Sequence, residues 1–406
     1  MRICFLVGSL AISGGTYVIF QHAAHLVTSG HDVLIAAQEP FTPETISWHD
    51  VAGKLTCVGL QEASKHEYDL VIATWWKTAL ELPRFNAGRF GYFVQSIESR
   101  FYPKTEGPLR RLIDATYGLP LNFVTEAGWI RDRLATDSGR DAALVRNGIR
   151  KDIYSEAISP IEERVEGSSR VLVEGHFRVP FKNTARAISL AKGAGAKDIW
   201  LLTGTPVRWI PGVRRVFSKV PINVAARVYR SCDVLVKLST VEGMFGPPLE
   251  MFHCGGTAVV LNVTGHEEYI RHGENAIVIA DQDEARIQAA ITTLLRDRSL
   301  LNTLTKGARD TASQWPSWAE SSARFERWIV SLNDVEATDR SSVADQVRAA
   351  FETYERDERE RLAADPSIRR GYWVDNITRR LPRSALSCLE NINAVLELNL
   401  LSRPIR

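Results

Sequence analysis

The chain has 406 residues, a length that favours two or three domains. Hydrophobic residues make up 45% of it and charged residues 24%, as in an ordinary soluble α/β protein. The formal net charge of +2 argues against wholesale binding of nucleic acid, but it permits a local basic cleft for a phosphorylated small molecule. The five cysteines lie far apart and form no CxxC, so reduced thiols are expected rather than a disulfide framework or a zinc site.

Residues 1–150 are predicted to form a domain around a parallel sheet. The opening run RICFLVG enters a glycine turn, which favours a buried first strand over a secretion signal. A helix is predicted over TYVIFQHAAHLVTSG, ending at Gly30, and further strands over HDVLIAA, YDLVIATW, RFGYFVQ and LNFVTEA. No apolar run approaches the ~20 residues that span a bilayer.

The same alternation restarts after a polar stretch at 151–168, which is the predicted linker. The second domain is placed at 169–334, with strands over SRVLVEG, DIWLLTG, DVLVKLS, GTAVVLN and NAIVIA. The expected fold class is therefore α/β, with two Rossmann-like, doubly wound domains that face each other across a cleft. The last helix of the second domain, near WPSWAESSARFERWIV, is expected to cross back to the first domain.

Residues 335–406 differ in composition from the two domains and are predicted to form a helical extension. A strongly charged helix ends at Pro366, and arginines and aromatic residues then precede an amphipathic stretch. Three interpretations stay open. The extension packs on the rest of the chain, touches a membrane surface, or contacts another protein.

The segment VEGMFGPPLE carries two glutamates, Glu242 and Glu250, directly after the predicted strand DVLVKLS. Ligands bind at the carboxyl end of the strands in open α/β sheets. Pro247 and Pro248 suit the first turn of a helix and would place Glu250 in that turn, while Gly246 permits close approach of a ligand. Because carboxylates accept hydrogen bonds from sugar and ribose hydroxyls, the spacing suits a nucleotide sugar. In the alternative, one glutamate favours the helix dipole and the other is solvated.

Two cations follow the strand SRVLVEG, and two glycines follow the first strand of the chain. Arg178 and Lys182, with Asn183 as a helix cap, can hold a diphosphate and neutralise it as it leaves, unless they are only surface charge. Gly14 and Gly15 can bring a helix N-terminus close to a donor phosphate or sugar, unless they form a plain turn. The further donor-binding candidates at strand and helix ends are Thr203, Gly204, Gly246 and Leu249.

The string from CDVLVKLS to GENAIVI at 232–279 resembles the donor-binding core of the retaining family 4 glycosyltransferases, which have the GT-B fold. The two glutamates with seven residues between them, the GHFRVPFKN loop and VRNGI at 145–149 carry the resemblance. It implies that Arg178 and Lys182 bind the diphosphate, Glu250 the ribose and Glu242 the donor sugar, with Arg178, Lys182 and Glu242 as the catalytic set. The second glycine after Glu242 is shifted by one position, and Arg178 and Lys182 are four apart where five is usual, so the loop contacts stay open.

A narrower resemblance concerns the donor sugar. GYFVQSIESRFYP and PPLEM are similar to bacterial rhamnosyltransferases of surface-polysaccharide assembly, which implies a dTDP-L-rhamnose donor.

Residues at two strand ends of the first domain are the acceptor-binding candidates, namely Gln95, Glu98, Trp75 and Tyr102. Aromatic rings at such positions either stack on sugar faces or belong to the core. Glu98 would be the general base if the anomeric centre were inverted. The retaining family is thought to need no such base, because the leaving diphosphate accepts the acceptor proton, and the sequence leaves this choice open.

No metal and no cofactor are expected. Asp281-Gln282-Asp283 is interpreted as a helix cap, and the nine histidines show no metal-ligand spacing. The predicted function is transfer of a hexose from a UDP-, GDP- or dTDP-linked donor to a saccharide or lipid-linked saccharide. We expect a cytoplasmic protein without a nucleic-acid partner, with possible contact to the inner face of the membrane through 335–406. The rivals are a sugar-nucleotide epimerase and a non-catalytic sugar-nucleotide-binding scaffold.

Overall fold

The structure is a computed structural model that describes residues 1–364, and the predictions made for 365–406 lie outside the described residues. The described chain divides into two compact units. Unit 1 comprises residues 1–148 and 318–364, and unit 2 comprises residues 149–317. Residues 318–334, which the sequence assigned to the second domain as its crossing helix, thus belong to unit 1.

Unit 1 is built on a seven-stranded parallel sheet in the order β3-β2-β1-β4-β5-β6-β7. All residues of β1 except the first are buried, as expected for a parallel sheet covered on both faces. The strands are β1 (Arg2–Val7), β2 (Asp32–Ala37), β3 (Thr56–Gly59), β4 (Glu67–Ala73), β5 (Asn86–Val94), β6 (Asn122–Thr125) and β7 (Ala142–Leu144).

The helices of unit 1 connect these strands and add two long C-terminal segments. The α-helices are α1 (Gly14–Thr28), α2 (Pro43–Ile46), α3 (Leu60–Ala63), α4 (Trp76–Glu81), α5 (Gly107–Thr116), α6 (Gly128–Ser138), α12 (Trp318–Ser331) and α13 (Arg340–Ala364). The short 3-10 helices are η1 (Ala52–Lys54), η2 (Leu82–Arg84), η3 (Glu98–Phe101) and η6 (Leu332–Asp334).

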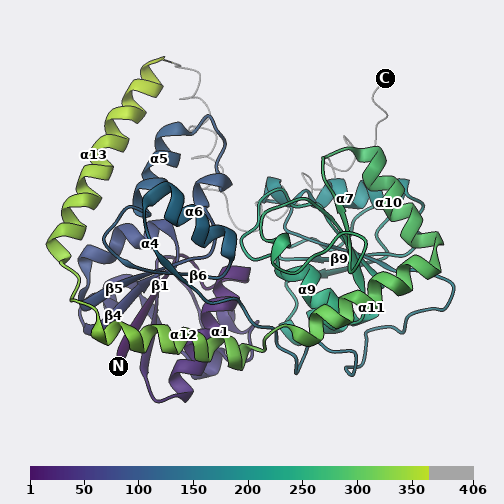
Figure 1. The fold of residues 1–406 in the computed structure, drawn as a ribbon, viewed down its shortest axis with the longest axis horizontal. Helices are drawn as coiled ribbons and strands as arrows, with labels where there is room; N and C mark the ends of the chain where they lie inside the picture. The colour runs from purple at the N-terminus through teal and green to yellow at the C-terminus, as the bar shows by residue number, and fades with distance from the viewer. Residues whose placement is uncertain (365–406) are drawn as a thin grey trace. The chain divides into compact units, whose positions relative to one another are not determined.

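Helix α12 packs along α1 and completes the core of unit 1 (Figure 1). The fully buried Phe325 ring stacks on the imidazole of His22, with ring centroids 4.2 Å apart. His22 Nδ1 lies 3.0 Å from the Ser322 hydroxyl, so the buried imidazole of α1 also has a polar partner on α12. The helix that the sequence counted with the second domain, and expected to cross back to the first, is therefore part of the hydrophobic core of the first.

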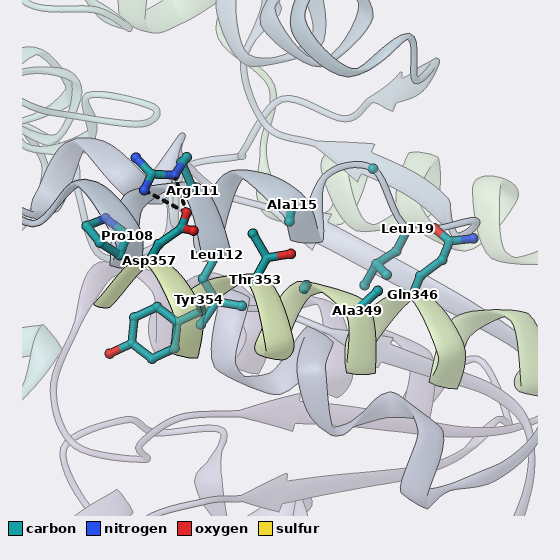
Figure 2. A pocket seen from close by; sticks show the side chains of 12 residues that line it. Pro108, Arg111, Leu112, Ala115, Leu119, Gln346, Ala349, Thr353, Tyr354 and Asp357 are labelled. Atoms are coloured by element: carbon teal, nitrogen blue, oxygen red, sulfur yellow. Dashed lines mark hydrogen bonds and ion pairs between the residues drawn. The ribbon is translucent and has the colours of Figure 1, made fainter. Parts of the chain in front are cut away.

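Helix α13 lies along α5 on the outside of unit 1 (Figure 1). Its few buried apolar residues include Val343 and Val347, and the Arg111–Asp357 ion pair at 2.7 Å joins the two helices. A cavity of about 330 Å³ lies between them, with this ion pair at one end and Leu119 near the other (Figure 2). The charged helix thus packs on its own chain over residues 340–364.

Unit 2 is built on a six-stranded parallel sheet in the order β10-β9-β8-β11-β12-β13. The strand order reverses between β8 and β11, so these two neighbours form the switch point at which open α/β sheets bind ligands. The strands are β8 (Val171–Glu174), β9 (Ile199–Thr203), β10 (Arg215–Ser218), β11 (Val234–Lys237), β12 (Thr257–Leu261) and β13 (Ile277–Ile279). The helices are α7 (Thr184–Gly193), α8 (Ile222–Ser231), α9 (Gly246–His253), α10 (Glu284–Arg296) and α11 (Arg298–Gln314), with η4 (Pro180–Lys182) and η5 (His266–Glu268).

Residues 151–168, which were predicted to form a linker, pack on unit 2 through charged contacts. Glu162 pairs with Arg214 at 2.6 Å and with the buried Arg170 at 2.9 Å. Arg164 donates hydrogen bonds to the Cys254 and Gly255 carbonyls at 2.8 and 2.5 Å. Across residues 1–364, no helix combines the length and the apolar character needed to cross a membrane.

Replacing Phe325 by alanine should lower the free energy of unfolding of unit 1 by about 3–5 kcal/mol, because it removes a fully buried ring and leaves a cavity. Urea unfolding followed by a probe in each unit measures this. The control is Val330→Ala on the same helix, whose side chain is 48% exposed and whose loss should change the stability by only about 0.5 kcal/mol. A shift confined to the unit 2 transition would contradict the placement of α12.

Candidate functional site

The candidate site lies at the carboxyl ends of β8 and β11 in unit 2. These strands end in Glu174 and Lys237, one residue beyond the paired Val173 and Val236. The two side chains form an ion pair, and Lys237 is only 1% exposed. Parallel pairing at the switch point therefore puts a buried cation and a carboxylate where a ligand is expected.

The loop after β8 is fastened to the end of β11 by two hydrogen bonds. The Asn183 side chain donates to the Leu238 carbonyl at 2.9 Å, and the Thr240 N–H donates to the Phe181 carbonyl at 2.8 Å. Asn183 has a left-handed backbone, with φ of 50°, and it occupies the N-cap position of α7 without a side-chain cap bond. Its predicted place at the helix cap is therefore confirmed, but its side-chain amide joins two loops instead of capping the helix.

This fastening brings Lys182 and Glu242 together. Lys182 Nζ lies 2.8 Å from both carboxylate oxygens of Glu242, and Lys237 Nζ lies 3.8 Å from the nearer one. Burial alone raises the pKa of Glu242, but the two ammonium groups outweigh it and hold the pKa below its usual range. Glu242, which is 8% exposed, is thus a buried, ionised acceptor between two cations.

Glu250 lies beside this group, on α9. Pro247 and Pro248 occupy the first turn of α9, as predicted, but the helix begins at Gly246. Glu250 is therefore its fifth residue and starts the second turn, and its predicted place in the first turn is wrong. Burial and then the charge of Glu174 raise the pKa of Glu250 to about 7.

The phenol hydroxyls of two buried residues, Tyr229 and Tyr154, hydrogen-bond the Glu250 carboxyl group. A partly buried carboxyl group held in this way can accept bonds from vicinal hydroxyls of a ribose. Leu249, by contrast, is fully buried under the helix and contributes packing.

A glycine allows the neighbouring loop to approach Glu242 closely. Gly265 has a φ of +89°, and a Cβ on it would lie 2.0 Å from the Gly243 carbonyl oxygen. The Thr264 hydroxyl donates to the Glu242 carbonyl at 3.2 Å. The loops after β11 and β12 therefore support each other's backbone at the site.

The other donor-binding candidates of unit 2 lie on flanking loops. Arg178 has an exposed side chain in the loop between β8 and η4. Thr203 ends β9, is 4% exposed, and accepts a hydrogen bond from the Thr205 N–H at 3.1 Å. A Cβ on Gly204 would lie 3.1 Å from the His176 ring, and nothing lies within 4 Å of one on Gly246.

The candidates in unit 1 form a group of their own. Gly14 is the first residue of α1, whose N-cap Ser13 accepts from the Thr16 N–H at 3.1 Å. A Cβ on Gly15 would lie 3.3 Å from the Gln95 side chain, so two predicted residues are neighbours here. The donor-binding role of the two glycines stays a prediction.

Glu98 is buried beneath the aromatic residues of the predicted acceptor region. Its carboxyl group accepts hydrogen bonds from the Trp76 N–H at 2.7 Å and from the Tyr92 hydroxyl at 3.1 Å. Burial raises the pKa of Glu98 to about 8, although both hydrogen bonds oppose that rise. Trp76 is itself 5% exposed and donates to the Tyr102 hydroxyl at 3.3 Å, while Trp75 is half-buried. Glu98 thus holds the start of α4, and its role toward an acceptor stays a prediction.

Within the part of the chain that the structure describes, no group of three or more His, Cys, Asp or Glu side chains is placed to hold a metal ion. Asp283 caps α10, accepting from the Ala285 and Arg286 N–H groups at 2.8 and 3.2 Å, which confirms the predicted cap.

Sequence reasoning missed Glu174, Lys237 and Tyr229 as parts of the site. The available signal was a lysine in DVLVKLS, because lysine is almost never fully buried unless it is paired. The pairing partner was not visible, since Glu174 is 63 residues away along the chain.

The raised pKa of Glu98 predicts a pH-dependent stability. Between about pH 4.5 and pH 8 the folded state keeps this carboxyl group protonated and the unfolded chain does not, so stability falls as the pH rises through that window. Glu98→Gln keeps an accepting oxygen but cannot ionise. The free energy of unfolding of this variant, relative to wild type, should therefore be about 2–4 kcal/mol higher at pH 8 than at pH 5. Urea unfolding of unit 1 at both pH values measures this, with the exposed Glu39→Gln as control. A pH-independent difference would refute the buried, neutral carboxyl group.

Comparison with known proteins gives a family match over part of the candidate site. Residues 215–311 match the family model described as Glycosyl transferases group 1, and this segment contains both Glu242 and Glu250. The O-antigen biosynthesis protein RfbC of Myxococcus xanthus is 26% identical over 262 residues, which are 62% of this chain and 20% of that protein. The chain thus spans about a fifth of the length of this relative.

Solved structures resemble the chain over most of its length. Sucrose-phosphate synthase (tll1590) from Thermosynechococcus elongatus covers 83% of this chain and 100% of its own, with a TM-score of 0.63 and 15% identity. HepE of Anabaena in complex with UDP-glucose covers 82% and 100%, with a TM-score of 0.65 and 15% identity. WaaG, a glycosyltransferase involved in lipopolysaccharide biosynthesis, covers 81% and 99%, with a TM-score of 0.60 and 13% identity.

At these identities the structural likeness establishes the fold, and the predicted GT-B fold with two Rossmann-like domains is confirmed. Residues 215–311 of unit 2 are thus similar to the glycosyl transferases group 1 family.

Proposed function

We propose that the chain is a retaining glycosyltransferase of family 4 that moves a hexose from a nucleotide diphosphate sugar to a saccharide or lipid-linked saccharide. The observation that carries the proposal is the grouping of Lys182, Glu242 and Glu250 at the switch point of unit 2. A cation and two carboxylates within one ligand length match the three parts of such a donor.

Each part of the donor has a chemical partner in this group. The Lys182 ammonium and the guanidinium of Arg178 stabilise the negative charge that develops on the leaving diphosphate. Glu242 is ionised and accepts hydrogen bonds from the hydroxyls of the transferred sugar. Glu250, held by two tyrosine hydroxyls, accepts from the ribose.

Donor binding must rearrange one contact. In the structure, Lys182 and Glu242 satisfy each other, at 2.8 Å. The diphosphate replaces Glu242 as the partner of Lys182, and the sugar hydroxyls replace Lys182 as partners of Glu242. Exchanging one set of charged hydrogen bonds for another avoids leaving a buried carboxylate unpaired.

Retention follows if the leaving diphosphate accepts the acceptor proton on the face from which it departs. No carboxylate base is then needed, which agrees with the burial of Glu98 and its accepted hydrogen bonds. The acceptor sugar is assigned to the carboxyl edge of the unit 1 sheet, near Gln95 and the half-buried Trp75.

The biological setting is proposed from the relatives. One is named for O-antigen biosynthesis, and a structural neighbour is described as involved in lipopolysaccharide biosynthesis. We therefore assign the chain to assembly of a surface polysaccharide at the cytoplasmic face of the membrane. L-Rhamnose from a dTDP donor is the specific sugar proposed, on the resemblance of GYFVQSIESRFYP and PPLEM.

The test is a thermal-shift screen of wild type against UDP, GDP, dTDP and their sugar conjugates. A ligand at about 100 times its Kd adds roughly 2.7 kcal/mol to the folded state, so the correct nucleotide should raise the Tm of unit 2 by several degrees. Glu250→Ala should abolish the shift, and the exposed Glu166→Ala should keep it.

The screen also separates the rivals. Binding without turnover of any acceptor would favour a scaffold, and product from the donor alone would favour an epimerase. The absence of any shift with wild type would refute the donor site itself.

A further inference from the structure

A buried lysine, Lys237, lies in the candidate site but makes none of the proposed contacts with the donor. Lys237 ends β11, one of the two central strands of the unit 2 sheet, and is 1% exposed. Its neighbours along the chain, Val236 and Leu238, are fully buried and apolar. An ammonium group here loses its hydration, so burying Lys237 costs folding free energy.

The lysine is held by the adjacent strand. Its ammonium group pairs with the Glu174 carboxylate and lies 3.4 Å from the Glu174 carbonyl oxygen. Burial lowers the pKa of Lys237, but Glu174 and Glu242 outweigh it and the pKa is raised, so the group stays charged. Because both residues end paired parallel strands, this cation is fixed to the sheet.

Glu242 therefore has two cationic neighbours of different kinds. Lys182 contacts it at 2.8 Å from a short 3-10 helix and is 24% exposed. Lys237 lies 3.8 Å from it and is fixed and buried. A lysine on a partly exposed loop can turn to a ligand, whereas one buried in the sheet cannot.

We propose that Lys237, held by Glu174, is a positioning residue that keeps the Glu242 carboxylate ionised and in place when Lys182 turns to the donor diphosphate. The inference rests on the proposed function, because it assumes that a diphosphate draws Lys182 away. Lys237 itself touches no part of the donor.

The physical consequence of losing Lys237 is proton uptake. Once Lys182 leaves, Glu242 would be a buried carboxylate without a counter-charge, and such a group takes up a proton near neutral pH. Nucleotide binding would then be coupled to protonation, and affinity would fall as the pH rises.

Other groups that face this cluster also titrate. Glu250 on α9 has a pKa of about 7, raised by burial and by the charge of Glu174, so its ionisation contributes to every pH profile and changes when Glu174 is replaced. The comparison must accordingly be between two variants that both lack the Glu174 charge. The groups that face Glu242 and Lys237 or their direct partners are Glu174, Lys182, Glu250, His176, Tyr154, Tyr229 and Tyr269.

Two variants separate positioning from folding. Lys237→Met alone leaves the partly buried Glu174 without its partner and can destabilise unit 2. The double variant Glu174→Gln with Lys237→Met removes both charges, so no carboxylate is stranded on the sheet while Glu242 still lacks its fixed cation. The matched background is Glu174→Gln alone, which lacks the same carboxylate as the double variant but keeps Lys237.

The measurement is titration calorimetry with UDP, GDP and dTDP, each at pH 6, 7 and 8, in buffers of different ionisation enthalpy. The double variant should bind the nucleotide with uptake of about one more proton than Glu174→Gln, and its affinity should fall by up to about tenfold more per pH unit. Equal slopes and equal proton uptake in the double variant and in Glu174→Gln would overturn the proposal.

Failure of the proposed function gives a different result. If wild-type protein binds none of the three nucleotides, the donor site fails and this inference fails with it. If wild type binds and the double variant matches Glu174→Gln at every pH, the donor site stands and only the role of Lys237 is refuted.

Discussion

The pairing of β8 with β11 is the constraint on which the candidate site depends. Because the two strands run parallel and end together, Glu174 and Lys237 meet at the sheet edge in the middle of unit 2. Their loops leave from the same edge, and two hydrogen bonds between those loops set Lys182 against Glu242. Every charged contact of the site follows from this one register.

The charges of the site are balanced only as a group. Two lysines and two of the three glutamates, Glu174 and Glu242, neutralise one another, and Glu250, with its pKa raised to about 7, is readily protonated. A buried cluster of this kind stabilises the fold little, since desolvation offsets much of the Coulomb attraction. Its value lies in keeping strong hydrogen-bond acceptors and cations ready for a ligand that exchanges partners with them.

Unit 1 shows how the same class of sheet can be completed by distant sequence. Helix α12 begins 290 residues after α1 ends, yet Phe325 and His22 stack in one core. The composition of α12 does not show that it packs against α1, because an amphipathic helix fits any apolar face of suitable length. The helix of residues 340–364 is similar, since its contacts with α5 depend on a few ion pairs and small buried residues.

The sequence by itself determined the fold class, because central parallel strands are buried on both faces and read as short apolar runs. It missed β3, β7 and β10, which all lie at sheet edges, where burial is incomplete and the apolar signal is weak. It also singled out Glu242 and Glu250, because their spacing along the chain is local and resembles that of a known family, and Lys182, because its loop resembles that family's. Only the tertiary structure decided the partner of Lys237, the contact made by the Asn183 side chain and the partners of α12 in the core of unit 1. Each of these depends on residues far apart in the chain that meet through strand register and packing, and no local pattern encodes such meetings.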